Sequence, residues 1–143
     1  MQKTIMGAAA GALVLAAAGG ASAHHSFGAE FDQNRPVTLH GEVVMFEWTN
    51  PHSWIHVNVV DEETGETVLW RVEGGAPSAL LRRGWNRNSL PPGTEIEVSG
   101  FGARDGDTRM SASDISFPDG RELSLGNPGA STAAAAVASQ AED

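Results

Sequence analysis

The sequence predicts an all-β domain with one short helix, and three observations indicate this class. Segments rich in β-branched and aromatic residues recur along the chain, and one of them alternates strictly between apolar and polar residues. Turn-forming glycines, prolines and asparagines separate these segments. Cysteine is absent, so the burial of apolar side chains must stabilise the fold without disulfides.

Three strands are expected in the first half of the domain. Residues 37–48 are rich in valine and aromatic residues, and Gly41 is expected to mark a bulge or bend in this strand. Residues 54–60, WIHVNVV, alternate with a period of two, as a half-buried strand does. Residues 67–73, TVLWRVE, form the third strand after the turn DEETGE. Together the three predict a meander.

A short helix is expected in APSALLRR, residues 76–83. Pro77 suits the first turn of a helix, and Gly84 lies just beyond its end. Leu80 and Leu81 are expected to face inward, with two arginines in the last turn, where they suit the negative end of the helix dipole.

Two further strands, residues 94–103 and 109–118, complete the pattern. Five strands with a helix between the third and the fourth have the chain order of the OB-fold, a small and partly open Greek-key barrel. A barrel also removes exposed strand edges. The alternative, a β-sandwich, usually needs about seven strands. We therefore expect an OB-fold-like, five-stranded Greek-key barrel.

Two segments of different composition flank this domain. Residues 1–23 have the layout of a secretory signal peptide, with Lys3 near the start, an apolar stretch and Ala-Ser-Ala at the end. The apolar stretch is too short for a convincing transmembrane helix, so no membrane span is expected after cleavage. Residues 126–143 are small, polar or alanine-rich and are expected to be a disordered tail. The domain is thus expected over residues 24–125 of an exported, periplasmic protein.

The exported part is expected to be strongly acidic. Lys3 is the only lysine, so eight arginines remain against eighteen carboxylates, a formal charge of −10. Such a surface repels phosphate backbones, which argues against a nucleic-acid partner. Signatures of catalysis are also missing, since there is no HExxH motif and no nucleophile elbow. The sequence therefore favours a binding role over an enzyme.

Several motifs carry a resemblance to a known family. They are HHSFGAEFD, PVTLHGEV, EWTNPHSWIHV, EGGAPSALLRRGW, LPPGTEIEVSGFGARDG and SFPDGRE. Together they resemble the DUF6152 family of exported bacterial proteins, from His24 to about Leu125. The resemblance implies export but no activity, because the family is defined by sequence.

The histidines behind the leader suggest a transition-metal site. If the leader is cut after Ala23, the free amine and the imidazole of His24 chelate one ion together, and His52 supplies a third nitrogen. Amine and imidazole nitrogens in this arrangement suit copper. His25 would be an auxiliary or substitute ligand. Phe27 and Phe31 are expected to pack on the barrel and hold the amino terminus near its body.

Two alternatives stay open for the same histidines. Cleavage after Ala21 gives a mature chain that starts Ser-Ala-His, which binds copper through its own amine, backbone amides and imidazole without His52. Alternatively, no metal is bound, and His24 and His25 are a solvated lead into the first strand.

The motif EWTNPHSW is the second candidate site. Asn50 and the following proline set a tight turn. In the metal hypothesis, Asp32 or Glu47 accepts a hydrogen bond that fixes the tautomer of His52. The alternative function is a metal-free periplasmic adaptor that holds a protein or a small ligand on a barrel face. The aromatic residues of that face would be Trp48, Trp54 and Trp85.

The motif EGGAPSALLRRGW is the third candidate. Its two glycines could present backbone amides to an anion. Arg82 and Arg83 are expected to pair with nearby glutamates in so acidic a protein. A structural role is favoured for this motif.

Overall fold

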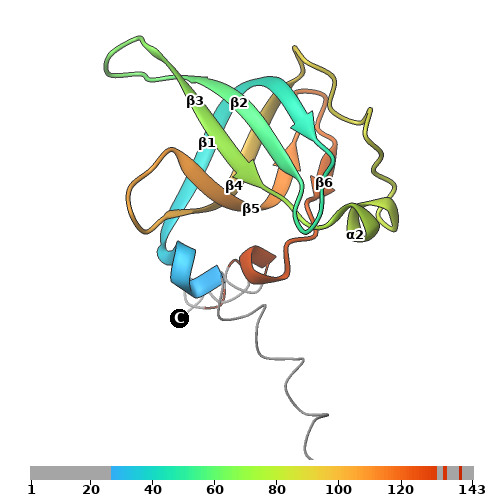
Figure 1. Ribbon diagram of the computed structural model, residues 1–143. Helices are drawn as coiled ribbons and strands as arrows, with labels where there is room; N and C mark the ends of the chain where they lie inside the picture. The colour runs from blue at the N-terminus through green and yellow to red at the C-terminus, as the bar shows by residue number, and fades with distance from the viewer. Residues whose placement is uncertain (1–26, 132–133, 135–138, 140–143) are drawn as a thin grey trace, which may run out of the picture.

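The chain is mostly β, with six strands in one sheet and few short helices (Figure 1). The structure is a computed structural model that describes residues 27–131, 134 and 139. Its elements are β1 (Phe31–Glu47), β2 (Trp54–Val60), β3 (Thr67–Glu73), α2 (Pro77–Leu81), β4 (Glu95–Ala103), β5 (Arg109–Ser116) and β6 (Glu122–Ser124). Residues 27–30 and 128–131 are also helical. The expected class, all-β with a short helix between the third and fourth strands, is confirmed.

The strands follow the order β3-β2-β1-β4-β5-β6, and neighbours in this order are antiparallel. The long strand β1 pairs with β4 along its first part and with β2 along its second part. In addition, β3 pairs with β5 in parallel, from Arg71 opposite Arg109 to Glu73 opposite Ser111. The last pair of this seam, Glu73 and Ser111, lies at the centre of the candidate site below.

The strand predictions hold where the local pattern is strong. β2 and β3 have the expected bounds. β1 begins earlier than expected, at Phe31, because its polar first part pairs with β4 despite its composition. The bulge lies between Val43 and Met45 and not at Gly41. A side chain at Gly41 would instead collide with the carbonyl oxygen of Asn58, so glycine is needed there for the close approach of β2.

The core lies between the inward faces of the strands and is covered at one end by α2 and the loop after it. Leu80 is fully buried and Trp85 is 2% exposed, and the indole Nε1 of Trp85 donates a hydrogen bond to the carbonyl oxygen of Ser124 at 3.1 Å. Leu81 was expected to face inward but is 58% exposed. The helix ends at Leu81, so only one side of its single turn meets the core, and the arginines lie at and beyond its cap.

The segment after β6 belongs to the domain, although the sequence places it in the tail. Asn127 and Ala130 are buried, and the helical residues 128–131 lie beside the helical residues 27–30 below the sheet (Figure 1). Asn127 accepts the backbone N–H of Ser131 at 3.0 Å and that of Gly129 through its side chain at 3.3 Å. This N-cap, with a proline after it, starts a helical turn that the alanine-rich composition obscures.

The start of the described chain is held against the sheet by aromatic contacts. The ring of Phe27 lies 5.7 Å from that of Phe31 and 6.2 Å from that of Phe101. Phe31 itself is 2% exposed. The expectation that Phe27 and Phe31 anchor this end of the chain is confirmed. Within the described part of the chain, no helix has the length and apolar character that a membrane crossing requires.

Candidate functional site

The candidate site is the turn between β1 and β2, because it carries His52. The Asn50-Pro51 peptide bond is cis. Thr49 Oγ1 donates to the carbonyl oxygen of His52 at 3.1 Å, which closes the turn. His24 and His25, the other two proposed ligands, lie outside the described residues.

The turn is fastened to the segment that follows β3. Ser53 donates to the carbonyl oxygen of Gly75 through both its backbone N–H, at 3.1 Å, and its hydroxyl, at 2.9 Å. Gly74 returns its N–H to the carbonyl oxygen of Ser53 at 3.0 Å, and Gly75 donates to that of Leu125 at 2.8 Å. Both glycine amides are therefore engaged within the fold, so the glycine pair serves close packing and offers no free donors to an anion.

The His52 ring is held from one side only. Its Nδ1 lies 3.2 Å from Oε1 of Glu73 and 3.3 Å from the carbonyl oxygen of Gly74, and the side chain is 42% exposed. Both neighbours of Nδ1 are hydrogen-bond acceptors, so Nδ1 carries the hydrogen in the neutral ring. The lone pair then lies on Nε2, which meets no polar partner among the residues that the structure describes. This is the arrangement in which a metal-binding histidine is oriented by a carboxylate.

Glu73 is a buried carboxylate, with 8% of its surface exposed. Burial raises the pKa of Glu73, and the charge of Glu30 acts in the same direction, whereas His52, Asn127 and Arg109 favour the ionised form. Asn127 Nδ2 donates to Oε1 of Glu73 at 3.3 Å and also to the hydroxyl of Ser111. The carboxylate is thus fixed from two sides, by an imidazole and by an amide.

The acceptors expected for His52 lie elsewhere. Oε2 of Glu47 is 3.1 Å from Nε2 of His56, on the neighbouring strand. Asp32 accepts the backbone N–H of Asn34 at 3.0 Å. The acceptor is Glu73 instead, a residue that the sequence does not mark as a partner of His52. The hairpin register could have revealed it, because Glu73 lies opposite Trp54 at the end of β3.

The three tryptophans do not share an exposed face. Trp85 is in the core, as described above. Trp48 is half-buried and packs edge-on against Phe46, with the ring centres 5.5 Å apart. Trp54 is half-buried beneath the guanidinium of Arg71, at 4.6 Å. Asn50 is exposed in the turn.

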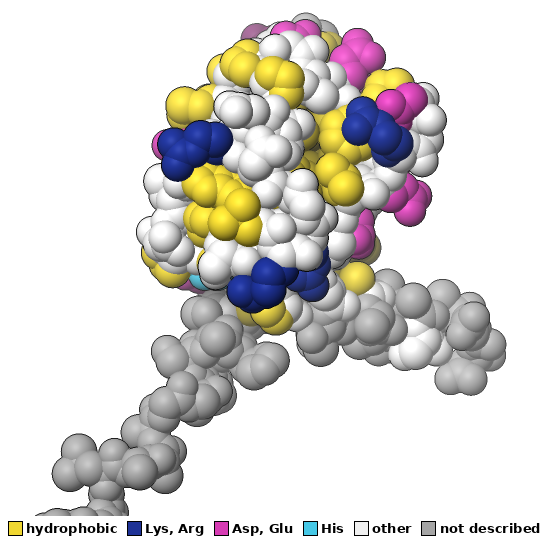
Figure 2. Space-filling model, turned by 90° about the vertical axis from the view of Figure 1, so that its right-hand side faces the viewer, with side chains coloured by type: hydrophobic (Ala, Val, Ile, Leu, Met, Phe, Trp, Pro, Cys, Tyr) yellow, Lys and Arg dark blue, Asp and Glu magenta, His cyan; other side chains and the backbone are white. Residues whose placement is uncertain are grey.

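The arginines that follow α2 form no ion pairs within the described residues. Arg82 and Arg83 are exposed, and neither lies within salt-bridge distance of a described carboxylate, so the expected pairing with glutamates is not found in this part of the chain. The guanidinium of Arg83 lies against Gly126 instead. Figure 2 views the molecule from the side of α2 and shows basic side chains set among hydrophobic patches.

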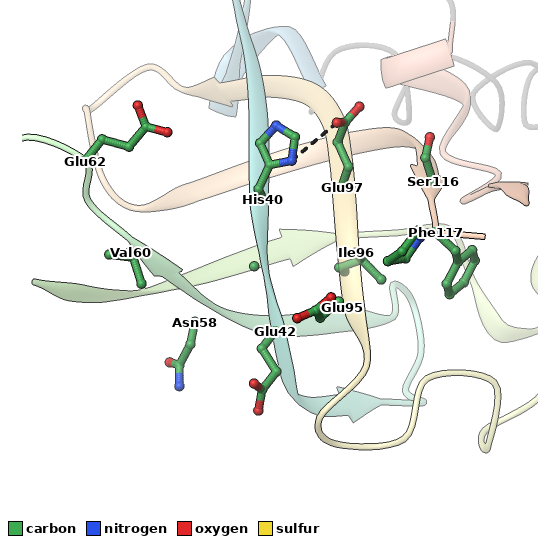
Figure 3. A pocket seen from close by; sticks show the side chains of 12 residues that line it. His40, Glu42, Asn58, Val60, Glu62, Glu95, Ile96, Glu97, Ser116 and Phe117 are labelled. Atoms are coloured by element: carbon green, nitrogen blue, oxygen red, sulfur yellow. Dashed lines mark ion pairs between the residues drawn. The ribbon is translucent and has the colours of Figure 1, made fainter. Parts of the chain in front are cut away.

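A groove of about 590 Å³ lies apart from this turn, on the outer side of β1, β2 and β4 (Figure 3). Its lining includes the glutamates Glu42, Glu62, Glu95 and Glu97 beside apolar residues such as Val60 and Phe117. No lysine or arginine is among the lining residues, and Nδ1 of His40 lies 3.3 Å from Oε2 of Glu97. The groove is therefore suited to a cationic ligand.

No cluster of three histidine, aspartate or glutamate side chains able to hold a metal ion occurs among the described residues. His52 therefore needs ligands from elsewhere, such as the segment before Phe27, to form a metal centre.

Comparison with known proteins gives one match. A family model described as a family of unknown function, DUF6152, matches residues 11–112. No curated protein and no solved structure matches the chain. Because the family model covers more than half of the sequence, this chain belongs to the DUF6152 family.

Proposed function

We propose that this chain is an exported, periplasmic binding protein that holds copper at its mature amino terminus, on an OB-fold-like Greek-key barrel. The strand pairings support the barrel. β1 pairs with β2, β2 with β3, β3 with β5, β5 with β4 and β4 with β1, so the series returns to its first strand. Five strands in a small, partly open barrel, with the helix between β3 and β4, is the OB-fold arrangement.

The observation that carries the metal proposal is the contact between His52 and Glu73. A buried carboxylate and a carbonyl oxygen hold Nδ1, and they leave Nε2 as the nitrogen that can donate a lone pair. In the proposed centre, Nε2 of His52 is the third nitrogen beside the amine and imidazole of His24, with His25 as the auxiliary ligand. A set of imidazole and amine nitrogens favours copper among the common divalent metals.

The anchoring of Phe27 supports the access of the amino terminus to His52. Phe27 lies against Gly129, and Asn127, two residues earlier, contacts Glu73, which contacts His52. His24 precedes Phe27 by three residues, and an extended chain spans at most about 3.6 Å per residue. Three residues therefore reach at most about 11 Å from the anchor at Phe27.

The test uses the exported, mature protein. Its intact mass fixes the cleavage site, and titration with Cu(II) is followed by electron paramagnetic resonance. The His52→Ala variant is expected to lose one nitrogen coupling, whereas His40→Ala, which removes an exposed histidine that lies 3.3 Å from Glu97, should keep the wild-type spectrum. Copper binding with unchanged couplings in His52→Ala would remove His52 from the site. A mature chain that begins at Phe27 or later would exclude the proposed centre.

A second candidate function is a metal-free adaptor, favoured by the acidic groove of Figure 3. Because the tryptophans do not form one exposed face, the groove is the better surface for a partner, and its charge selects a basic segment. Titration with a synthetic arginine-rich peptide tests this candidate. Binding should weaken with salt and in a Glu95→Gln, Glu97→Gln double variant, but not in Glu63→Gln, Glu66→Gln, which removes two charges from the exposed β2–β3 turn. Equal affinity of both double variants would contradict it.

A further inference from the structure

We infer that Asn127 is a positioning residue for the His52 site, and that the helical turn it starts also fixes the position of Phe27. This inference rests on the proposed role of His52, and it adds a residue from a segment that reads as a tail. Its test does not require a metal.

The first part of the inference rests on the hydrogen bonds of the Asn127 side chain. Asn127 is 4% exposed, and both groups of its side chain are engaged. Nδ2 donates to Oε1 of Glu73 and to the hydroxyl of Ser111, while Oδ1 accepts the N–H of Gly129. Glu73 and Ser111 are register partners of the parallel β3–β5 seam, so one side chain bridges the two strands at their last pair.

The oxygen that Asn127 contacts is the one that faces His52. Oε1 of Glu73 lies 3.3 Å from Nδ2 of Asn127 and 3.2 Å from Nδ1 of His52. Two donors directed at a single oxygen fix the rotation of the carboxylate. The rotation of the carboxylate, in turn, determines how well Nδ1 of His52 is held. Asn127 therefore acts on His52 through Glu73.

The second part of the inference rests on apolar contacts between the helical turn that starts at Asn127 and Phe27. A methyl group built at Gly129 would lie 2.6 Å from Cγ of Phe27, so the ring packs directly on the backbone of this turn. Ala130 is fully buried in the same small cluster, with Phe101. The position of Phe27, the first described residue, is therefore set by residues 127–130.

The test is nuclear magnetic resonance of the metal-free protein, with the imidazole nitrogen shifts of His52 as the readout. Wild type should show the tautomer with hydrogen on Nδ1. Asn127→Ser keeps an N-cap hydroxyl but is too short to reach Glu73, and it should give a mixture of tautomers. Ser111→Ala removes only the other acceptor and should keep the wild-type tautomer. If Asn127→Ser does not fold, Asn127→Asp, which keeps the cap and removes the donor, takes its place.

A second variant tests the apolar part separately. Gly129→Ala should weaken the nuclear Overhauser effects between Phe27 and Phe101 and leave the His52 tautomer unchanged. An unchanged tautomer in the folded Asn127 variant, with only a lower melting temperature, would overturn the positioning role. An absence of copper binding alongside the expected tautomer change would contradict the proposed function and leave the role of Asn127 intact.

Discussion

The imidazole of His52 and the carboxylate of Glu73 meet at 3.2 Å at the open end of the β2–β3 hairpin, where Trp54 pairs with Glu73, and the imidazole is partly exposed whereas the carboxylate is buried. A buried carboxylate of this kind fixes the orientation and the tautomer of its histidine. Through this contact, buried Glu73 determines the orientation of the His52 ring, whose Nε2 carries the lone pair.

Replacing Glu73 with glutamine should weaken copper binding. The substitution keeps the volume of the side chain but removes the charge that holds Nδ1 of His52, and changes of this kind reduce metal affinity by about 10-fold to 100-fold. Competition titration with a chromophoric chelator measures the affinity. Glu97→Gln is the matched control because it removes a carboxylate from the exposed His40. An equal copper affinity of Glu73→Gln and wild type would show that the contact between His52 and Glu73 does not contribute to metal binding.

Trp85 should behave as a core residue. It is 2% exposed and its indole N–H is bonded to Ser124, so Trp85→Ala should lower the free energy of unfolding by about 3–5 kcal/mol. Trp54→Phe, at a half-buried position, should cost much less. Chemical denaturation followed by circular dichroism gives both values. A loss below about 1 kcal/mol for Trp85→Ala would contradict the burial of this indole.

The elements that the sequence predicts well are those set by local pattern. In β2 the alternation of apolar and polar residues is strict, because one face of the strand is buried and the other is not. β6 has only three residues, too few for a periodic pattern, and it forms because β5 offers an edge. Leu81 was misplaced for a similar reason, since a helix of five residues ends before its far side can meet the core.

The candidate site was only partly predictable. His52 stands out because it lies in a turn beside asparagine and proline, which local sequence reveals. Its acceptor depends on the register of β2 against β3, and Asn127 is 54 residues from the glutamate it contacts. Tertiary contacts of this range leave no local trace except the Asn-Pro start of a helical turn.

Gly41 should tolerate no side chain. A Cβ there would meet the carbonyl oxygen of Asn58, which belongs to the backbone of the paired strand and cannot move alone. Gly41→Ala should therefore lower the free energy of unfolding by about 1–3 kcal/mol, the usual cost of overpacking. Gly28→Ala is the control because nothing lies within 4 Å of its Cβ. Thermal denaturation of the two variants should separate them, and equal stability would contradict the close approach of β1 and β2.

Asp61 should make the stability of the β2–β3 turn depend on acid pH. The backbone N–H groups of Thr64 and Glu63 each donate to Oδ1 of Asp61 at 2.9 Å, and these bonds hold the pKa of Asp61 below its ordinary value of 3.8. A carboxyl whose pKa is lower in the folded state stabilises the fold above its unfolded pKa, and this stabilisation is lost as the pH falls through the folded value. Asp61→Asn keeps an acceptor oxygen but lacks the charge. The melting temperature of wild type should therefore exceed that of Asp61→Asn near neutral pH, and the difference should shrink as the pH falls below 3.8.

Glu62→Gln removes the same charge from the adjacent position, which contributes no side-chain hydrogen bond to the turn within the described residues, and it should follow the wild-type curve. A difference between wild type and Asp61→Asn that is constant with pH would show that the two backbone bonds do not favour the ionised carboxylate.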